Sequence, residues 1–175
     1  MHLYPETITK LATELIESCK AKGWYVATAE SCTGGLIGGA LTDIAGSSAI
    51  VDRGFITYTN KAKMQILGVR AETLRAVGAV AEETAREMAE GAIRQSASHL
   101  AVAVTGIAGP GGTADKPGGR VHLAVADRDG VLEHRQMDYG DIGRTEVRLA
   151  TVTTALEMML AASNFVRHSK SIQAE

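Results

Sequence analysis

Apolar residues along the chain follow two kinds of pattern. Where they recur every three or four positions between polar residues they predict helices, and short unbroken apolar or β-branched runs predict strands. The first pattern predicts helices at residues 7–22, 33–45, 60–67, 71–77, 82–98 and 143–161. The second predicts strands at residues 24–28, 55–59, 100–106, 120–127 and 131–139.

The order of these elements indicates one α/β sandwich. The run at 100–106 is apolar throughout, which is typical of a strand that is covered on both faces. Asp129 and Gly130 predict a hairpin between the last two strands, so at least one pair must be antiparallel and the sheet must be mixed. We expect a single domain over residues 1–164, followed by a polar tail at 165–175.

Composition and charge restrict the kind of protein. Of the 175 residues, 45% are hydrophobic and 22% are charged, which is ordinary for a soluble domain, and the net charge of −2 argues against a nucleic-acid surface. Two cysteines, Cys19 and Cys32, make no disulfide framework. Neither a membrane span nor a signal peptide is indicated. We therefore expect a cytoplasmic protein with no nucleic-acid or membrane partner.

The stretch TAESCTGG at 28–35 places Ser31 between a predicted strand and a predicted helix. The crevice at the carboxyl ends of strands is the usual ligand site of open α/β sheets, and free N–H groups at a helix start stabilise an oxyanion. Gly34 and Gly35 would let a substrate approach the backbone. Ser31 is thus a candidate nucleophile, although serines before helices are commonly N-caps and Cys32 is a rival nucleophile.

A serine nucleophile needs a base, and none of the five histidines has triad spacing. Lysine is the alternative. The stretch YTNK places Tyr58 and Lys61 three residues apart, so both can face one side of a strand-to-helix turn. A desolvated lysine can serve as a base near neutral pH, whereas most lysines are simply solvated. Lys61 is therefore the candidate base.

A glycine-rich loop follows the third predicted strand, at residues 105–119. Its glycines could present N–H groups to an anion or to a carbonyl oxygen. It matches neither a Walker loop nor the GxGxxG fingerprint, because GK[ST] is missing and a strand follows rather than a helix. The loop is either a pocket wall or a flexible connection.

Two arginines open the last predicted helix. Arg144 and Arg148 are four residues apart, so they share one helix face near its N-terminus, where a phosphate could bind. Exposed ion pairs with Asp141 or Glu146 are the alternative. No residues have the spacing of a metal site, and no cofactor is expected.

Four segments together resemble a known family. They are TAESCTGGLIGGALTDIAGSS (28–48), GFITYTNKAKMQILGV (54–69), GAVAEETAREMAEGA (78–92) and AVTGIAGPGGTADKPGGRVHLAVA (103–126). They resemble the C-terminal domain of the competence/damage-inducible protein CinA, whose stand-alone members are nicotinamide-nucleotide amidohydrolases. One departure is Ala81, where a serine is expected; a lost helix N-cap is the expected consequence.

The resemblance implies hydrolysis of the carboxamide of nicotinamide mononucleotide, in pyridine nucleotide salvage. It also implies a three-layer α/β/α sandwich with a mixed, mostly parallel five-stranded sheet. Ser31 would be the nucleophile, Lys61 its base, and Tyr58 would lie beside them. The residues expected at the substrate are Glu30, Cys32, Thr33, Gly34, Gly35, Thr105, Gly106, Gly109, Gly111 and Gly112, together with Arg144 and Arg148, whose phosphate role is inferred from their spacing and not from the resemblance.

Two other functions fit the sequence. The same serine and lysine could serve an amidase of a related small molecule, or the domain could be a non-catalytic nucleotide-binding or regulatory module. The set of Ser31, Tyr58 and Lys61 favours an enzyme, because binding alone does not require it. We also expect a homo-oligomer, a dimer by preference, because twofold dimers are the commonest oligomers and the helix at 33–45 is rich in small residues.

Overall fold

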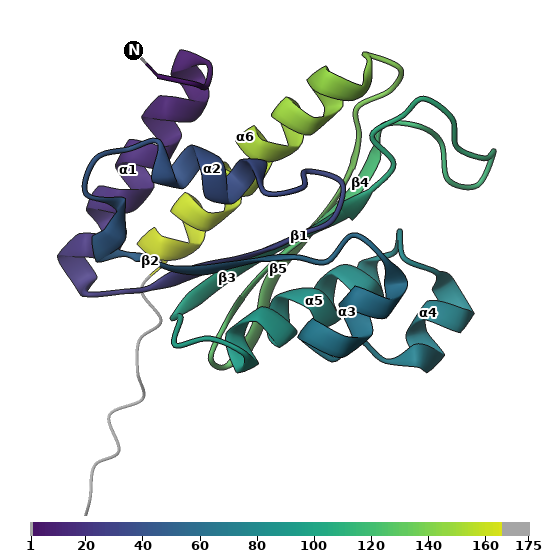
Figure 1. Cartoon of the computed structure of the whole chain (residues 1–175), viewed down its shortest axis with the longest axis horizontal. Coiled ribbons are helices and arrows are strands. Elements are labelled where there is room, and N and C mark those ends of the chain that lie inside the picture. The colour runs from purple at the N-terminus through teal and green to yellow at the C-terminus, as the bar shows by residue number, and fades with distance from the viewer. Residues whose placement is uncertain (1, 166–175) are drawn as a thin grey trace, which may run out of the picture.

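The computed structural model describes residues 2–165, so the predicted tail lies, except for Phe165, outside the described residues. Within this part of the chain, five strands form one sheet in the order β2-β1-β3-β4-β5 (Figure 1). The strands are β1 (Val26–Glu30), β2 (Val51–Ile56), β3 (Leu100–Gly106), β4 (Arg120–Asp127) and β5 (Gly130–Asp138). β1 is parallel to β2 and β3, and β4 is antiparallel to β3 and β5. The predicted mixed sheet is confirmed, and only β4 runs against the other strands.

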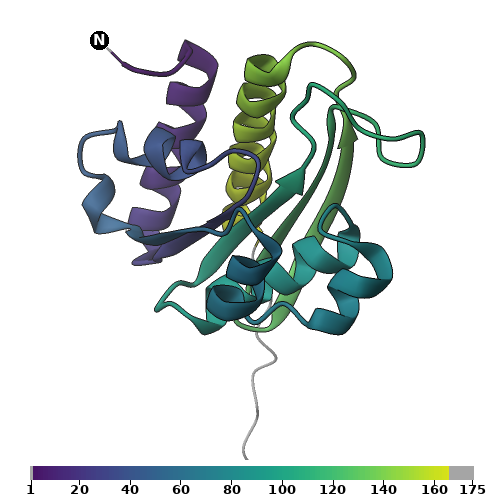
Figure 2. The same ribbon diagram turned by 45° about the vertical axis from the view of Figure 1, so that its right-hand side comes forward.

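Helices cover both faces of the sheet (Figures 1 and 2). One layer contains α1 (Glu6–Lys22), α2 (Leu36–Thr42) and α6 (Arg144–Asn164), and the other contains α3 (Asn60–Leu67), α4 (Ala71–Val77) and α5 (Glu82–Arg94). A short 3₁₀ turn, Ser47–Ala49, precedes β2. The predicted three-layer α/β/α sandwich is therefore confirmed. Among residues 2–165, no helix is long and apolar enough to cross a membrane.

The two faces of the sheet carry different side chains. Along β3, Leu100, Val102 and Val104 pack into the core beneath α1, α2 and α6, while Ala101 and Ala103 face α5. Small alanines let α5 approach the sheet closely. α3 in turn lies close to α5, because Gly91 has no Cβ that would collide with the backbone of Leu67. This packing brings α3 to the carboxyl ends of the parallel strands.

Some predicted boundaries are shifted. The predicted strand at 24–28 is found two residues later, at Val26–Glu30, which places Ser31 directly after its end. The predicted strand at 55–59 ends earlier, at Ile56, because the Thr59 hydroxyl accepts a hydrogen bond from the Ala62 N–H (3.1 Å) and caps α3. α2 begins only at Leu36, because the backbone of Gly34 and Gly35 is left-handed, with φ of 61° and 101°.

Candidate active site

Ser31 lies at the carboxyl end of β1, in the middle of the parallel part of the sheet. Its N–H donates to the carbonyl of Val104 on β3 at 3.1 Å, which continues the β1–β3 ladder by one residue. The residue is 8% exposed. Ser31 thus sits where the ends of β2, β1 and β3 meet, the position at which open α/β sheets bind ligands.

The amine of Lys63 contacts the hydroxyl of Ser31. Lys63 Nζ lies 2.9 Å from Ser31 Oγ and donates to the carbonyl oxygens of Thr57 (2.8 Å) and Tyr58 (3.3 Å). The side chain is only 1% exposed. Burial lowers the pKa of Lys63 to about 8, because desolvation disfavours the charged amine. A serine hydroxyl and a lysine that can lose its proton near neutral pH are thus in hydrogen-bond contact.

The predicted placement of Lys61 beside Ser31 is wrong. Lys61 is exposed, whereas Lys63, two residues later, is buried. Residues two apart on a helix point about 200° apart, so only one of the two can face the sheet. Lys63 shares its face with Leu67, four residues further on, which is fully buried. This apolar partner is the signal in the sequence that identifies the inward-facing lysine.

Glu30 holds the backbone of the turn that carries Ser31. Its carboxylate is 1% exposed. It accepts hydrogen bonds from the Thr33 hydroxyl (2.7 Å) and from the N–H groups of Gly35 (3.0 Å), Ile37 (3.1 Å) and Gly38 (2.9 Å). A carboxylate at a helix N-terminus satisfies the free N–H groups there. Its four acceptor bonds direct Glu30 into the turn, so its carboxylate holds the backbone that carries Ser31.

These contacts also decide the role of Ser31 in the turn. The N-cap residue of α2 is Gly35, which has no side chain with which to cap the helix. The carboxylate of Glu30 takes the place of an N-cap. The alternative in which Ser31 is only an N-cap therefore fails, and the serine hydroxyl is directed to Lys63.

Cys32 is a poor rival nucleophile. Its side chain is 5% exposed, and burial raises the pKa of the thiol to about 11. At neutral pH the sulfur is protonated, and the thiol is a much weaker nucleophile than the thiolate. The backbone is of more interest: within residues 2–165 no hydrogen bond uses the Thr33 N–H, the Cys32 N–H interacts with the thiol of its own residue, and the Gly34 N–H donates to the Ser31 carbonyl (3.1 Å).

The two arginines of α6 have different partners. Arg148 is half-buried and donates from Nε to the Cys32 carbonyl (3.1 Å) and from Nη2 to the Thr33 carbonyl (2.9 Å). Arg144 is exposed and donates to the Gly109 carbonyl (2.7 Å) and the Tyr58 hydroxyl (3.2 Å). Among the ion pairs of the described residues, none joins either arginine to Asp141 or Glu146.

Part of the glycine loop lines a cavity of about 480 Å³. Gly109 and Gly111 are in its wall, together with Arg144 and the backbone around Gly140 and Gly143. A chain of hydrogen bonds joins Arg144, in the wall of this cavity, to Ser31 by way of Tyr58 and Lys63, and Tyr58 is 58% exposed. Its hydroxyl accepts from Arg144, and its carbonyl accepts from Lys63. The loop therefore stands beside the serine and lysine pair, with Tyr58 between them.

Three further loop residues were predicted at the substrate. Thr105 is 1% exposed, and its hydroxyl donates to the Ala79 carbonyl between α4 and α5 (2.8 Å), so it joins the loop base to the helical layer. Gly106 ends β3, and Gly112 is exposed. None of the three lines the cavity that contains Gly109 and Arg144.

Of the histidines within residues 2–165, none hydrogen-bonds to Ser31. His122 Nδ1 and His134 Nε2 are 3.0 Å apart, and His134 Nδ1 is 3.4 Å from Glu82 Oε2. Among the described residues, the only side chain that hydrogen-bonds to the Ser31 hydroxyl is Lys63.

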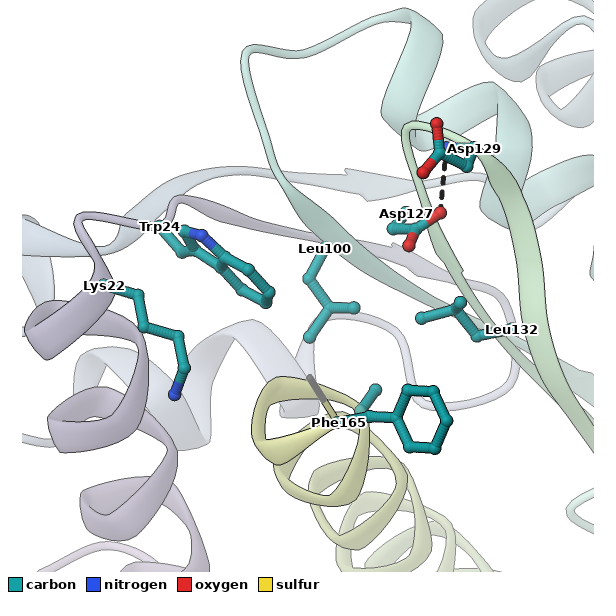
Figure 3. Close-up of a pocket in the computed structure, with 8 residues that line it drawn as sticks. Lys22, Trp24, Leu100, Asp127, Asp129, Leu132 and Phe165 are labelled. Carbon is teal, nitrogen blue, oxygen red and sulfur yellow. Dashed lines mark hydrogen bonds between the residues drawn. The ribbon is translucent and has the colours of Figure 1, made fainter. Parts of the chain in front are cut away.

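A second cavity, of about 340 Å³, lies at the other end of the sheet (Figure 3). It is lined by the first residue of β3, the last of β4 and the ends of α1 and α6, and includes Trp24, Phe165, Asp127 and Asp129. The N–H of Asp129 donates to the Asp127 carboxylate at 2.8 Å. Because this cavity faces the amino end of β3 and contains none of the predicted site residues, it is separate from the serine and lysine pair.

Known proteins match nearly the whole chain. The CinA C-terminal domain family matches residues 8–163. The nicotinamide-nucleotide amidohydrolase PncC of Enterobacter agglomerans is 50% identical over 153 residues, covering 86% of this chain and 92% of that protein. PncC of Escherichia coli (strain K12) is 45% identical over 154 residues, covering 87% of this chain and 92% of that protein. The crystal structure of the competence/damage inducible protein CihA from Agrobacterium tumefaciens superposes with a TM-score of 0.91 at 62% identity, covering 94% of this chain and all of that one. The resemblance found in the sequence is therefore confirmed, and the chain belongs to the CinA C-terminal domain family.

Proposed function

We propose that this chain hydrolyses the carboxamide of nicotinamide mononucleotide to nicotinate mononucleotide and ammonia. The observation that carries the proposal is the 2.9 Å contact between Lys63 Nζ and Ser31 Oγ, buried at the carboxyl ends of the parallel strands. The two PncC relatives described above carry the name nicotinamide-nucleotide amidohydrolase. In a cell the reaction would serve pyridine nucleotide salvage in the cytoplasm.

The first half-reaction uses Lys63 as a base. With a pKa of about 8, about a tenth of the amine is neutral at pH 7. The neutral amine accepts the Ser31 proton while Oγ attacks the carboxamide carbon, which gives a tetrahedral oxyanion. The protonated amine then donates its proton to the nitrogen of the leaving group, the C–N bond breaks, and ammonia departs. Ser31 is left as an ester of the nicotinate.

The second half-reaction reverses these roles with water. Lys63, neutral again, accepts a proton from a water molecule that attacks the ester carbon. The bond between that carbon and Ser31 Oγ breaks, and the ammonium of Lys63 returns a proton to the serine. The N–H of Thr33, two residues after the nucleophile, binds the oxyanion of both tetrahedral intermediates.

The exposed side chains beside this pair suit the rest of the substrate. Arg144 is exposed, has two neutral acceptors and lines the 480 Å³ cavity, so its guanidinium can bind the 5′-phosphate. The Tyr58 ring is 58% exposed between that arginine and Lys63. Its face can stack on the positively charged pyridinium ring. Tyr58 would then bind the substrate and not transfer a proton.

Ammonia release from the mononucleotide tests this proposal. Ser31→Ala should lower the rate about 10⁴-fold or more, because without the nucleophile no acyl-enzyme forms. Ser48→Ala, at an exposed position, is the matched control and should keep full activity. Nicotinamide riboside and free nicotinamide, run in parallel, should be poorer substrates because they lack the phosphate. Full ammonia release by Ser31→Ala would contradict the mechanism, and ligand binding without ammonia release by the wild type would indicate a binding module.

A further inference from the structure

We infer that Arg148 is a positioning residue for catalysis: its guanidinium holds the Cys32–Thr33 peptide so that the Thr33 N–H faces Ser31 Oγ and binds the oxyanion. The inference rests on the proposed function and replaces the phosphate-binding role that the sequence predicted for this arginine. The oxyanion site in the turn is therefore held in place by a residue of α6, whereas Lys63 comes from α3 in the other helical layer.

One guanidinium group binds two consecutive carbonyl groups of the serine turn. Arg148 Nε donates to the Cys32 carbonyl at 3.1 Å and Nη2 donates to the Thr33 carbonyl at 2.9 Å. The planar fork of arginine can make two such bonds in one fixed geometry, which the single ammonium of a lysine cannot. Both peptide units are thus fixed relative to α6, although 116 residues separate Arg148 from Cys32.

The planarity of the peptide bond determines where the Thr33 N–H points. The Cys32 carbonyl and the Thr33 N–H belong to one trans peptide, so they point in opposite directions. Arg148 pulls this carbonyl toward α6, which covers one face of the sheet. Lys63 and the Ser31 hydroxyl meet on the side of α3, which covers the other face. The Thr33 N–H is therefore turned from α6 toward the nucleophile.

The other N–H groups of the turn are already occupied. Glu30 binds those of Gly35, Ile37 and Gly38, and Gly34 donates to the Ser31 carbonyl. Within the described residues this leaves the N–H of Thr33 for a ligand, while that of Cys32 interacts with the thiol of its own residue. The positive charge on Arg148 also polarises the peptide that it binds, which makes the Thr33 N–H a stronger donor.

Arg148 has little capacity left for a phosphate. It is half-buried, and two of its three nitrogens bind the turn. An alanine Cβ at Gly34 would lie 3.6 Å from Nη2, so this nitrogen is also close to Gly34. Arg144, one helical turn earlier, is exposed and is the better phosphate ligand.

Steady-state kinetics can distinguish an arginine that positions the oxyanion site from one that binds the phosphate. Arg148→Gln and Arg148→Lys should lower kcat for the mononucleotide about 100-fold, while KM changes less than about threefold, because an oxyanion donor acts mainly in the transition state. Arg144→Gln, the matched control on the same helix, should raise KM about tenfold and change kcat little. A rise in KM at unchanged kcat in both Arg148 variants would overturn the inference.

A second readout does not depend on the substrate. A fluorophosphonate forms a bond from Ser31 Oγ to phosphorus, fluoride leaves, and Lys63 takes the serine proton; the phosphoryl oxygen then occupies the oxyanion site. Intact-protein mass spectrometry should show that Arg148→Gln and Arg148→Lys are labelled about 10- to 100-fold more slowly than the wild type, with thermal unfolding measured to confirm that the variants are folded. Labelling of both variants at the wild-type rate would overturn the inference.

The same measurement separates the two proposals. If the wild type is labelled at Ser31 and the Arg148 variants are slow, but ammonia is not released from the mononucleotide, the substrate assignment fails and the role of Arg148 stands. If the wild type is not labelled at Ser31 at all, both the nucleophile and the oxyanion site are wrong.

Discussion

Two glycine-containing segments meet at the candidate site and are held in different ways. In the serine turn, residues 31–38, buried or half-buried charges hold the backbone: Glu30 binds its N–H groups and Arg148 its carbonyl groups. The part of the glycine loop that follows β3, residues 107–119, projects beyond the sheet (Figure 2). It is tied down by Arg144 on the Gly109 carbonyl, Arg120 on the Asp115 carbonyl and Lys116 on the Val77 carbonyl, at 2.7, 2.7 and 2.5 Å.

The difference indicates a division of labour. Groups that stabilise a transition state must be fixed before the reaction begins, and a buried network of charge-assisted hydrogen bonds fixes the serine turn. A substrate-binding loop can adapt, because exposed contacts are weak and easily exchanged. We therefore expect changes in the serine turn to affect kcat and stability, and changes in the loop to affect KM.

After Ser31→Ala, the largest effect should come from the lysine of the pair. Lys63→Met should lower kcat/KM about 10³-fold, because the base is lost. Lys61→Met, two residues away at an exposed position, is the control and should stay within about threefold of the wild type. Ammonia release measures both. The free energy of unfolding of Lys63→Met should fall by no more than about 1 kcal/mol, because removal of a buried amine offsets the loss of its hydrogen bonds. Equal losses of activity in the two variants would refute the assignment of the base.

Glu30→Gln should give the next largest effect. The amide NH₂ would face backbone N–H groups that now donate to a carboxylate, so we expect a loss of about 2–4 kcal/mol in the free energy of unfolding and of about 100-fold in kcat. Urea denaturation and steady-state kinetics measure the two quantities. Glu17→Gln, on the exposed side of α1, is the control. A change in KM with no change in kcat or in the free energy of unfolding would show that Glu30 contacts the substrate, as the sequence predicted.

The pH dependence follows from the pKa of Lys63. Because only the neutral amine can accept the serine proton and burial lowers this pKa to about 8, kcat/KM should rise about tenfold per pH unit below pH 8 and level off above it. Initial rates between pH 5.5 and 9.5, in buffers of constant ionic strength (~0.1 M), give the midpoint. A rate that still rises tenfold per pH unit up to pH 9.5 would place the pKa near the ordinary lysine value of 10.5 and would mean that the amine is not desolvated in the enzyme.

The smallest effect should come from the loop. Lys116→Met removes the contact with the Val77 carbonyl, and because the loop is exposed we expect a change in unfolding free energy below about 1 kcal/mol. KM for the mononucleotide should rise about twofold and kcat should stay the same. A fall in kcat as large as that of Glu30→Gln would show that the glycine loop is as tightly coupled to the chemistry as the serine turn.

Much of the fold could be predicted from local patterns. Periodicity gave the helices and strands, and the hairpin signal at Asp129 and Gly130 gave the mixed sheet, which the structure confirms. The glycine pair Gly34 and Gly35 marked the turn. Their backbone is left-handed, a conformation that glycine adopts without strain and other residues do not. Ser31 could be located for the same reason, because the change from strand to helix depends on residues that are neighbours in the sequence.

Only the tertiary structure decided which side chains meet. Ser31 and Lys63 are 32 residues apart, and Cys32 and Arg148 are 116 apart. Whether Lys61 or Lys63 faces the serine depends on the rotation of α3 about its axis, which is fixed when Leu67 packs against α5. The two arginines of α6 have different partners because Arg148 faces the serine turn and Arg144 faces the glycine loop. Helix propensity and spacing place residues on a common face, but the direction of that face is set by the core against which the helix packs.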